Sequence, residues 1–266
     1  MVYSVENLSF AYGPEPVIAH AGFTMKPGVF YGLLGPNGCG KTTLIDLLVR
    51  HLNPGEGRIR FQGKNLECFS RKALSREVAL VAQNPVIHFP YKVSELVMMG
   101  RHPYIGRFSS PSAEDYRVVD RVMEQADVLQ FKHALITELS GGERQRALFA
   151  RALAQETPVL ILDEATSNLD IRHSLSLLSQ VRDDVERRGK TVVAVFQDIN
   201  MAALFCHHLL FMVKGHIHRE GQVEDVLDRQ VIRDVYGVDS KVCDELFSGT
   251  KQVLFQRTGL NHGEGL

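Results

Sequence analysis

The sequence contains no tryptophan and only four cysteines in 266 residues. Cys39, Cys68, Cys206 and Cys243 are widely spaced, and no two of them form a C-x-x-C pair. This spacing argues against a zinc cluster and against a disulfide framework. A reducing cytosol is therefore the compartment that the cysteine usage fits.

The sequence also lacks long hydrophobic runs and an excess of either charge. No segment approaches the roughly 18 consecutive apolar residues of a membrane span, and the N-terminus has no basic region followed by an apolar stretch. We therefore expect that the chain itself does not cross a membrane, while peripheral attachment to a membrane partner stays open. The 30 Lys and Arg residues balance 31 Asp and Glu residues, so no global field attracts nucleic acid.

The hydrophobic patterns predict an α/β fold in which strands alternate with helices around a largely parallel sheet. Alternation of apolar and polar residues at 2–10 and 17–25 predicts a strand pair, and the apolar run 29–34 predicts a buried strand. The further strands are expected at 57–61, 78–83, 159–162 and 191–196. The helices are expected at 41–52, 93–101, 113–131, from 140 to about 155, and at 171–188.

A glycine-rich segment that follows the buried strand matches the phosphate-binding pattern G-x-x-x-x-G-K-[ST] at every fixed position. Its glycines let backbone N–H groups turn toward phosphates, while Lys41 reaches the outer phosphates and the Thr42 hydroxyl can ligate Mg²⁺. We therefore expect ATP and Mg²⁺ as cofactors, the alternative being a glycine-rich turn with an incidental lysine. The expected ATP contacts are Gly35, Pro36, Asn37, Gly38, Cys39, Gly40, Lys41, Thr42 and Thr43.

Two carboxylates follow a later apolar strand and can complete this site. The run Val-Leu-Ile-Leu ends at Asp163, which is the candidate metal ligand, because a phosphate-bound Mg²⁺ needs a carboxylate from a neighbouring strand. Glu164 comes next and could polarise an attacking water as a general base. An ordinary solvated strand end is the alternative for this Asp-Glu pair.

The segment Leu-Ser-Gly-Gly-Glu-Arg-Gln-Arg at residues 139–146 resembles the signature motif of ATP-binding cassette (ABC) ATPases. In that family the motif closes over the ATP of a second subunit in a head-to-tail dimer. The resemblance therefore implies that Ser140, Gly141 and Gly142 contact the ATP of a second copy of this chain. A plain Ser N-cap followed by a Gly-Gly turn would explain Ser140 alone.

The resemblance also implies the fold and the domain organisation. We expect a single ABC ATPase domain over 1–266, with a P-loop NTPase (RecA-like) core, an antiparallel β subdomain and an inserted α-helical subdomain. The core and β subdomain would occupy approximately 1–85 and 157–240, and the helical subdomain 86–156. A C-terminal tail would follow at 241–266.

Further site residues are implied by position within the family pattern. Tyr12 corresponds to the aromatic residue that stacks on adenine, although packing in a turn is an alternative. Gln83 corresponds to the glutamine that senses γ-phosphate and metal, and Asp170 ends a segment that resembles the D-loop. Gln197 stands where the family usually has a switch histidine. A glutamine can hydrogen-bond phosphate but carries no titrating proton, so hydrolysis by Lys41, Glu164 and Gln197 would be slower or differently tuned, unless the glutamine is simply tolerated.

Residues 83–104 and 225–238 resemble importers of iron siderophores, haem, cobalamin and related metal chelates. This implies an ATPase at the cytoplasmic face of the inner membrane, attached peripherally to two permease subunits that dock beside residues 84–104. An extracytoplasmic substrate-binding protein would take part indirectly, and nucleic acid would not. The alternatives are an exporter or lipid-handling cassette, a soluble ABC protein acting on nucleic acid or ribosomes, and an ATP-binding regulator with little hydrolysis.

Three smaller features allow other interpretations. Cys39 lies within the phosphate loop, where a helix N-terminus can activate a thiol, so a redox or alkylation role is an alternative to simple fit. Two histidine pairs, at 207–208 and at 216 and 218, could suggest a metal site but lack a third ligand. The basic residues at 182–190 alternate with acidic ones, which indicates a solvated helix face.

Overall fold

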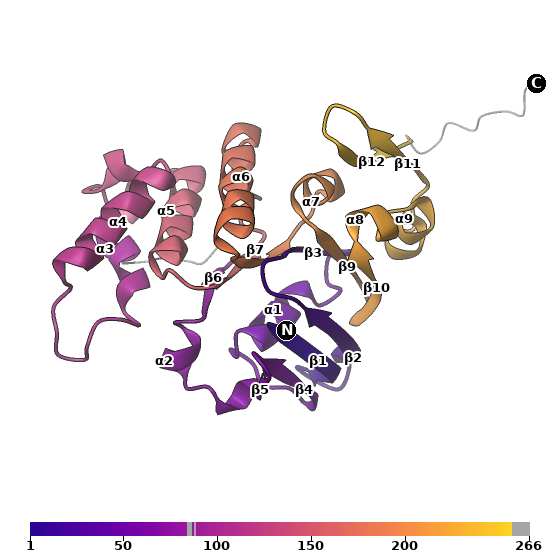
Figure 1. Ribbon diagram of the computed structural model, residues 1–266, viewed down its shortest axis with the longest axis horizontal. Helices are drawn as coiled ribbons and strands as arrows, with labels where there is room; N and C mark the ends of the chain where they lie inside the picture. Colours follow the sequence, from indigo (N-terminus) through magenta and orange to yellow (C-terminus); the bar gives the residue numbers. More distant parts are fainter. Residues whose placement is uncertain (84–86, 88, 257–266) are drawn as a thin grey trace, which may run out of the picture.

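The computed structural model describes residues 1–83, 87 and 89–256. Within these ranges the chain forms a six-stranded sheet, a four-stranded sheet and a two-stranded hairpin, with helices around them (Figure 1). The central sheet has the order β10-β9-β3-β8-β7-β6, and only its β9–β10 pair is antiparallel. Its strands are β3 (Phe30–Leu34), β6 (Val78–Val81), β7 (Val159–Asp163), β8 (Thr191–Val195), β9 (His208–Val213) and β10 (His216–Gln222).

Three of the four inner strands, β3, β7 and β8, are buried along their whole length, as expected for parallel strands covered on both faces. In the register of this sheet, Leu33 of β3 pairs with Val195 of β8, which in turn pairs with Asp163 of β7. The three strands therefore end at one edge of the sheet. The phosphate loop, Glu164 and Gln197 follow these ends directly.

The four-stranded antiparallel sheet lies below the central sheet in Figure 1 and packs beside helix α1 (Lys41–Leu48). The Tyr3 hydroxyl donates to the carbonyl of Leu48 at 3.1 Å, and the Tyr3 ring lies 5.0 Å from that of Phe61. This buried contact attaches the sheet to the helix that follows the phosphate loop. The strands are β1 (Tyr3–Ala11), β2 (Pro16–Met25), β4 (Glu56–Phe61) and β5 (Lys64–Asn65), in the order β2-β1-β4-β5.

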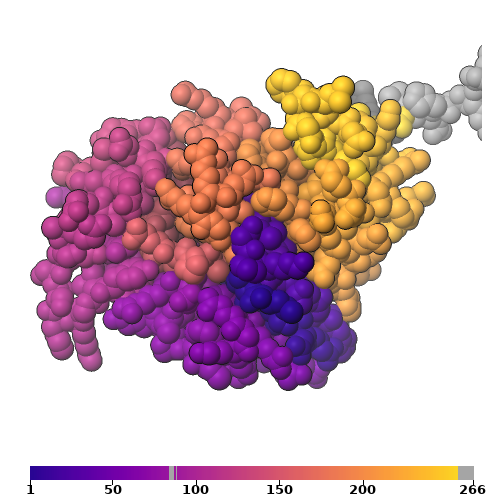
Figure 2. All heavy atoms as spheres, in the orientation of Figure 1, coloured from indigo at the N-terminus to yellow at the C-terminus, as the bar shows by residue number. Residues whose placement is uncertain are grey.

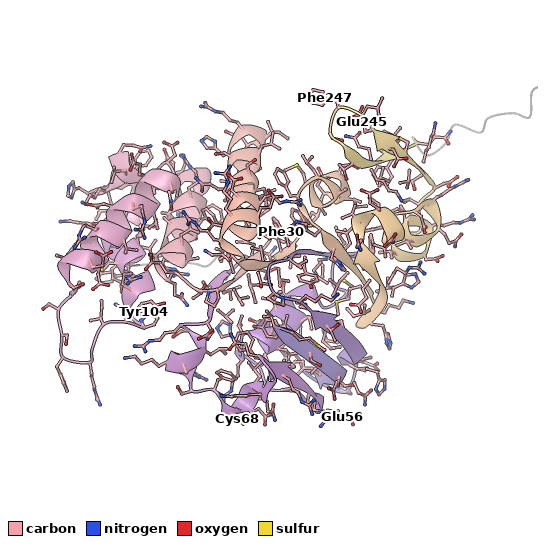
Figure 3. The ribbon with its side chains drawn as sticks, viewed as in Figure 1. Phe30, Glu56, Cys68, Tyr104, Glu245 and Phe247 are labelled. Carbon is pink, nitrogen blue, oxygen red and sulfur yellow. The ribbon has the colours of Figure 1, made fainter. Side chains whose placement is uncertain are left out.

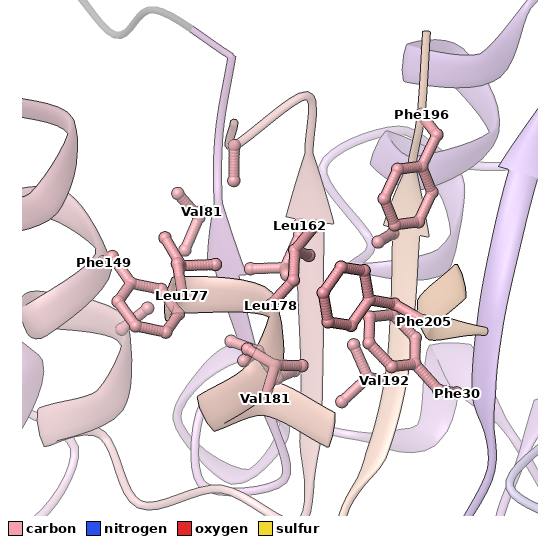
Figure 4. Close-up of a cluster of buried hydrophobic side chains, with 14 of the residues drawn as sticks. Phe30, Val81, Phe149, Leu162, Leu177, Leu178, Val181, Val192, Phe196 and Phe205 are labelled. Carbon is pink, nitrogen blue, oxygen red and sulfur yellow. The ribbon is translucent and has the colours of Figure 1, made fainter. Parts of the chain in front are cut away.

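Helix α6 (Ile171–Arg188) covers one face of the central sheet. Figure 4 shows Leu177, Leu178 and Val181 of this helix beside Leu162 of β7 and Val192 of β8 in one buried cluster. Each fully buried side chain of this size contributes about 1.5–3 kcal/mol relative to exposure. The apolar stripe of α6 therefore holds the helix against the strand that carries Asp163.

A group of helices forms the left side of the molecule in Figure 1: α3 (Val93–Met98), α4 (Ala113–Gln125) and α5 (Gly141–Ala154). The buried Arg101 joins them, because its Nε lies 2.9 Å from Oδ1 of Asp115 and its Nη1 lies 2.8 Å from the carbonyl of Ala154. The same Nη1 lies 2.7 Å from Oε2 of Glu156. Figure 3 labels Tyr104, whose ring lies 4.4 Å from the Arg101 guanidinium carbon.

The C-terminal part of the described chain packs on the right side of the sheet in Figure 1, and Figure 2 shows its hairpin projecting at the surface. Asn200 of α7 donates to the carbonyl of Val253 at 3.2 Å and accepts from its N–H at 2.8 Å, so the hairpin is fixed to this helix. The remaining elements are α2 (Arg71–Leu74), α7 (Ile199–Phe205), α8 (Val223–Val226), α9 (Arg229–Tyr236), β11 (Ser240–Glu245) and β12 (Thr250–Phe255), with 3₁₀ turns at Leu66–Cys68, Met99–Arg101, Leu129–Phe131 and Ile136–Glu138.

Several boundaries differ from the expectations. The helix expected at 41–52 ends at Leu48, because the chain turns through a left-handed Arg50, and the helix expected at 113–131 ends at Gln125, because Asp127 is left-handed. The strand expected at 78–83 ends at Val81, and the helix expected at 93–101 closes with a 3₁₀ turn. No described helix combines the length and the hydropathy needed to cross a bilayer.

Candidate active site

The phosphate loop runs from the end of β3 to the first residue of α1. Gly35 and Gly40 have φ angles of 154° and 104°, in the region that favours glycine. A Cβ on Gly35 would lie 2.2 Å from the carbonyl oxygen of Met212, and one on Gly40 would lie 2.8 Å from that of Val17. Both positions therefore require glycine for the loop to pass so close to the backbone of its neighbours.

The Lys41 side chain is buried against the loop that it follows. Its Nζ donates to the carbonyl oxygens of Gly35 at 2.7 Å and Pro36 at 2.9 Å. These neutral acceptors hold the ammonium at the mouth of the loop without neutralising it. The site thus offers a fixed positive charge beside the N-terminus of α1, an arrangement suited to an anion.

Asp163 ends β7 directly beside the loop and is only 3% exposed. The Thr42 hydroxyl lies 3.5 Å from its Oδ1. The pKa of Asp163 is raised to about 6, chiefly by burial and in smaller part by the nearby Glu164 and Asp46 carboxylates, while the Thr42 hydrogen bond and the charge of Lys41 act in the opposite sense. A buried carboxylate with other carboxylates nearby is the environment that a bound cation would stabilise.

Glu164 receives two amide donors on the same oxygen. Nε2 of Gln83 and Nε2 of Gln197 each lie 2.6 Å from Oε2 of Glu164. Glu164 has a φ angle of 50°, and the Ser167 hydroxyl closes the turn by donating to the Glu164 carbonyl at 2.9 Å. The left-handed backbone conformation of a glutamate costs of the order of 1 kcal/mol in free energy. The two amide hydrogen bonds keep the Glu164 side chain in one orientation.

A cavity of about 420 Å³ opens over the loop and brings half of the predicted site residues together. Val17 of β2 also lines it; sequence reasoning missed this residue, because nothing in an alternating strand pattern marks one apolar residue as a cavity wall. Gly35, Pro36 and Cys39 of the loop are outside the lining set, and so is Asp163 at the end of β7. The lining residues are Val17, Asn37, Gly38, Gly40, Lys41, Thr42, Thr43, Gln83, Glu164 and Gln197.

The other predicted residues do not line this cavity within the described part of the chain. Tyr12 is 67% exposed near the end of β1, and its ring lies 4.9 Å from that of Phe10. Ser140, followed by Gly141 and Gly142, caps α5, and its hydroxyl donates to Glu143 at 2.7 Å. Asp170 caps α6. None of these residues is therefore part of the wall of this cavity.

The structure shows the surroundings of Cys39, of the histidine pairs and of the basic residues at 182–190. Cys39 is buried, and burial raises the pKa of its thiol, which disfavours the thiolate that a redox role needs. His207 accepts from the N–H of Phe30 at 3.0 Å, a packing role. Across the described residues, no three His, Cys, Asp or Glu side chains gather as a metal site. Arg182, Arg187 and Arg188 pair with acidic residues along α6, as a solvated face would.

Residues 18–167 match the family model described as ABC transporter. The chain belongs to the ABC transporter family. This match confirms the predicted family and, with the strand order described above, the α/β fold class with a P-loop cassette. Cassettes of this family bind nucleotide, and the matched residues include the phosphate loop, the signature segment, Asp163 and Glu164 but not Gln197.

Two curated relatives illustrate the family. The ferric enterobactin transport ATP-binding protein FepC of Escherichia coli K12 is 33% identical over 249 residues, which cover 94% of this chain and 92% of the relative. The cobalamin import ATP-binding protein BtuD of Halobacterium salinarum strain R1 is 37% identical over 236 residues, or 89% of this chain. The match covers only 59% of the length of that second relative.

Solved structures show the same architecture. A structure described as the inward-facing conformation of a metal-chelate type ABC transporter superposes with a TM-score of 0.83 at 27% identity, covering 98% of this chain and 99% of that chain. One solved ATP-binding cassette of this fold is a dimer with ADP and phosphate bound. ABC cassettes thus work in pairs and, in importers, together with membrane subunits.

Proposed function

We propose that the chain is the ATP-hydrolysing subunit that powers import of a metal chelate, such as a siderophore, haem or cobalamin complex, through a membrane permease. The observation that carries the hydrolytic part is the position of Glu164, which two amides orient at the wall of the phosphate-loop cavity. The similarity to importers of ferric enterobactin and cobalamin supports the substrate class.

In this proposal the loop from Gly35 to Thr43 holds the triphosphate through its backbone N–H groups. Lys41 exchanges the carbonyls of Gly35 and Pro36 for outer phosphate oxygens, a favourable exchange because the phosphates carry full negative charge. The N-terminus of α1 adds its partial positive charge. The loop therefore binds and positions the group that is transferred.

The side-chain oxygens around Thr42 fit Mg²⁺. Thr42 and Asp163 offer a hydroxyl and a carboxylate oxygen, and the amide of Gln83 supplies a third oxygen, which is the donor type that Mg²⁺ prefers. The ion would neutralise charge on the phosphates. The buried Asp163, whose pKa is raised to about 6, would be held ionised by the added cation.

Glu164 is the proposed general base, with Gln197 and Gln83 as the groups that hold it. Because both amides donate to Oε2, they fix the plane of the carboxylate relative to the cavity. A water between Glu164 and the terminal phosphate would then face an aligned acceptor for its proton. Since an amide cannot titrate near neutral pH, Gln197 orients the base without changing charge.

The site is completed by a second copy in a head-to-tail arrangement. Ser140, Gly141 and Gly142 are proposed to close over the partner's ATP, since they stand at the N-terminus of α5 and do not line the cavity over the chain's own loop. Tyr12 would stack on adenine, for which its exposed ring is available. Asp170 would face the partner at the dimer boundary.

The proposed assembly contains two cassettes and two permease subunits at the cytoplasmic face of the inner membrane, with an extracytoplasmic binding protein that delivers the chelate and with no nucleic acid. The proposed domain division keeps 1–85 and 157–240 as the core, 86–156 as the helical subdomain and 241–266 as a tail. From Lys241 onward, part of that tail forms the hairpin of Ser240–Glu245 with Thr250–Phe255. Of the proposed docking segment 84–104, residues 84–86 and 88 lie outside the described residues.

Uptake by cells that lack the chain tests this function. Labelled ferric siderophore, haem and cobalamin are supplied separately, and we expect uptake of one chelate to return with the wild-type chain but not with Glu164→Gln. The wild-type chain should also co-purify with a polytopic membrane protein. Unchanged uptake of all three chelates, or co-purification with ribosomes or DNA, would contradict the proposal.

A further inference from the structure

His173 lies in the first turn of α6 between two carboxylates from different parts of the chain. Its Nδ1 lies 2.9 Å from both Oδ1 and Oδ2 of Asp170, and its Nε2 lies 3.8 Å from Oδ2 of Asp127. The side chain is 31% exposed. A protonated imidazole carries an N–H on each side of its ring, so in this form the one residue can present a donor to both carboxylates at once.

Asp127 connects this imidazole to the helix that follows the signature segment. The residue turns the chain after α4 with a φ angle of 53°. Nη1 of Arg146 in α5 lies 2.5 Å from Oδ2 of Asp127 and 2.9 Å from its carbonyl oxygen. The Arg146 side chain is 12% exposed, whereas that of Asp127 is 69% exposed, so a largely buried arginine of α5 fixes an otherwise exposed aspartate.

These contacts form one chain of side chains from Asp170, through His173 and Asp127, to Arg146. They therefore join the end of the segment 167–170 to α5, which begins directly after Ser140. The two segments also approach each other directly, since a Cβ on Gly142 would lie 3.4 Å from the carbonyl oxygen of Asn168. Helices α4, α5 and α6 are neighbours in Figure 1, so the link crosses from the helical group to the sheet-covering helix.

His173 is outside the chemistry of the loop itself. It does not line the 420 Å³ cavity, and Asp127 and Asp170 form no three-residue metal group with it in the described part of the chain. Arg172 also lies near this cluster, since its charge, after the hydrogen bonds and the charge of His173, helps to lower the pKa of Asp170. The contacts of His173 instead indicate a structural role, in which the residue holds the segment 167–170 and helix α5 in a fixed relative position.

We propose that His173 is a positioning residue that holds the signature segment in register with the segment 167–170, so that both meet the partner copy together. This inference rests on the proposed function, because it assigns His173 a role in closure of the ATP-binding dimer. Asp170 contacts Nδ1 of the imidazole. Asp127, which Arg146 holds in place, faces Nε2. Loss of the Asp127 contact leaves the two segments free to approach the partner separately, which lowers the fraction of productive closures.

A pair of substitutions separates the two sides of the ring. In His173→Asn the amide nitrogen falls near the Nδ1 position and retains Asp170 but does not reach Asp127, whereas in His173→Gln it falls near Nε2 and reaches Asp127. We expect His173→Asn to lower kcat about five- to tenfold, with the KM for ATP within about twofold, the size of effect that one lost contact pair produces. His173→Gln should stay within about twofold of the wild-type kcat, because the backbone N–H of residue 173, 2.8 Å from Oδ1 of Asp170, still holds that carboxylate.

Two controls keep the experiment specific. His51→Asn alters a similar pair, since His51 Nδ1 lies 3.0 Å from Oδ1 of Asp46, and should leave kcat unchanged. Asp127→Asn breaks the same link from its exposed side, so it should lower kcat like His173→Asn, and the double variant should be no worse than either single one. Thermal melting within about 2 °C of wild type shows that the variants are folded.

The inference is overturned if His173→Asn retains the wild-type kcat, if His173→Gln is impaired as strongly as His173→Asn, or if the double variant with Asp127→Asn is additively worse. It is also overturned if the loss of kcat follows the loss of melting temperature across the variants. Failure of the proposed function gives a different result, because the wild-type protein itself would then not hydrolyse ATP. If the wild-type protein hydrolyses ATP and any of the outcomes in this paragraph is found for the variants, only the role of His173 is contradicted and the proposed function stands.

Discussion

The side-chain amide nitrogen of Gln197 lies 2.6 Å from Oε2 of Glu164. Gln83 donates to the same oxygen at the same distance, so the proposed base is held from two elements that follow different strands. Both donors are neutral amides, which cannot change charge in the physiological pH range. Gln197 thus contacts the proposed base directly, and its effect on hydrolysis is expected to pass through Glu164.

Substituting Gln197 tests this contact. Gln197→His places a titrating imidazole at the wall of the cavity, so we expect kcat to acquire a steeper dependence on pH between about 5 and 7, where imidazole becomes cationic. Gln197→Ala removes the donor and should lower kcat roughly tenfold while the KM for ATP changes little. The measurement is ATPase activity against pH; rates and profiles equal to wild type in both variants would remove any role for this position.

The raised pKa of Asp163 predicts how the stability of the protein depends on pH when neither nucleotide nor Mg²⁺ is bound. Its pKa is raised from 3.8 to about 6 in the folded protein, chiefly by burial. The folded state therefore favours the protonated form, and the stability gained from protonation is full below about pH 4 and is lost as pH rises through about 6. Asp163→Asn, which is always neutral, should raise the free energy of unfolding at pH 7 by about 2 kcal/mol and abolish Mg²⁺-dependent hydrolysis.

Denaturant unfolding at pH 5 and pH 7 measures this effect. The difference between Asp163→Asn and wild type should shrink at the lower pH, while the surface variant Asp183→Asn should show little difference at either pH. An Asp163→Asn protein that is less stable than wild type at pH 7 would contradict the assigned environment.

Cysteine labelling tests the burial of Cys39. Cys68 is exposed, whereas Cys39 is buried with a raised thiol pKa. We expect a maleimide at pH 7 to label Cys68 first, with ATPase activity retained, and Cys39→Ala to keep activity within about twofold because no reactive thiolate is needed. Mass spectrometry of the labelled peptides gives the order of reaction. Rapid labelling of Cys39 with inhibition that ATP prevents would instead support a reactive thiol.

Arg101 should contribute strongly to stability. Its guanidinium is buried between Asp115, Glu156 and the carbonyl of Ala154, so Arg101→Met leaves a buried carboxylate without its partner. Removing one member of such a cluster costs about 3 kcal/mol or more. Arg117→Met is the matched control, since Arg117 pairs with Glu114 at the exposed surface and should cost less than about 1 kcal/mol. Equal losses in the two variants, measured by denaturant unfolding, would contradict this difference.

The sequence predicts the phosphate-binding edge of the sheet well, because glycine spacing and apolar strands act locally. The loop from Gly35 to Thr42, the strand before it and the carboxylates after β7 all lie where the patterns indicate. Helix ends were less predictable. Arg50 and Asp127 adopt the left-handed conformation just after their helices, and neither residue type marks such an end in the sequence as glycine does.

The arrangement of the site depends on long-range pairing that the sequence does not reveal. Gln83, Glu164 and Gln197 follow three strands that are distant in the chain, and only the strand order β8-β7-β6 brings their side chains together. The hairpin Ser240–Glu245 with Thr250–Phe255 was expected only as a tail, because its strands mix charged and apolar residues and the pairing is stabilised by Asn200 of α7. Val17 reaches the cavity for the same topological reason.

The molar mass of the Glu164→Gln protein with ATP tests the central claim most directly. This variant should bind ATP and Mg²⁺ but lose turnover by about 100-fold or more, so that the closed dimer accumulates. Light scattering should then report twice the chain mass of 29.8 kDa with ATP and the single chain mass without it, and Ser140→Arg in the same background should abolish the change. A mass of 29.8 kDa at saturating ATP, or wild-type hydrolysis by Glu164→Gln, would contradict the account.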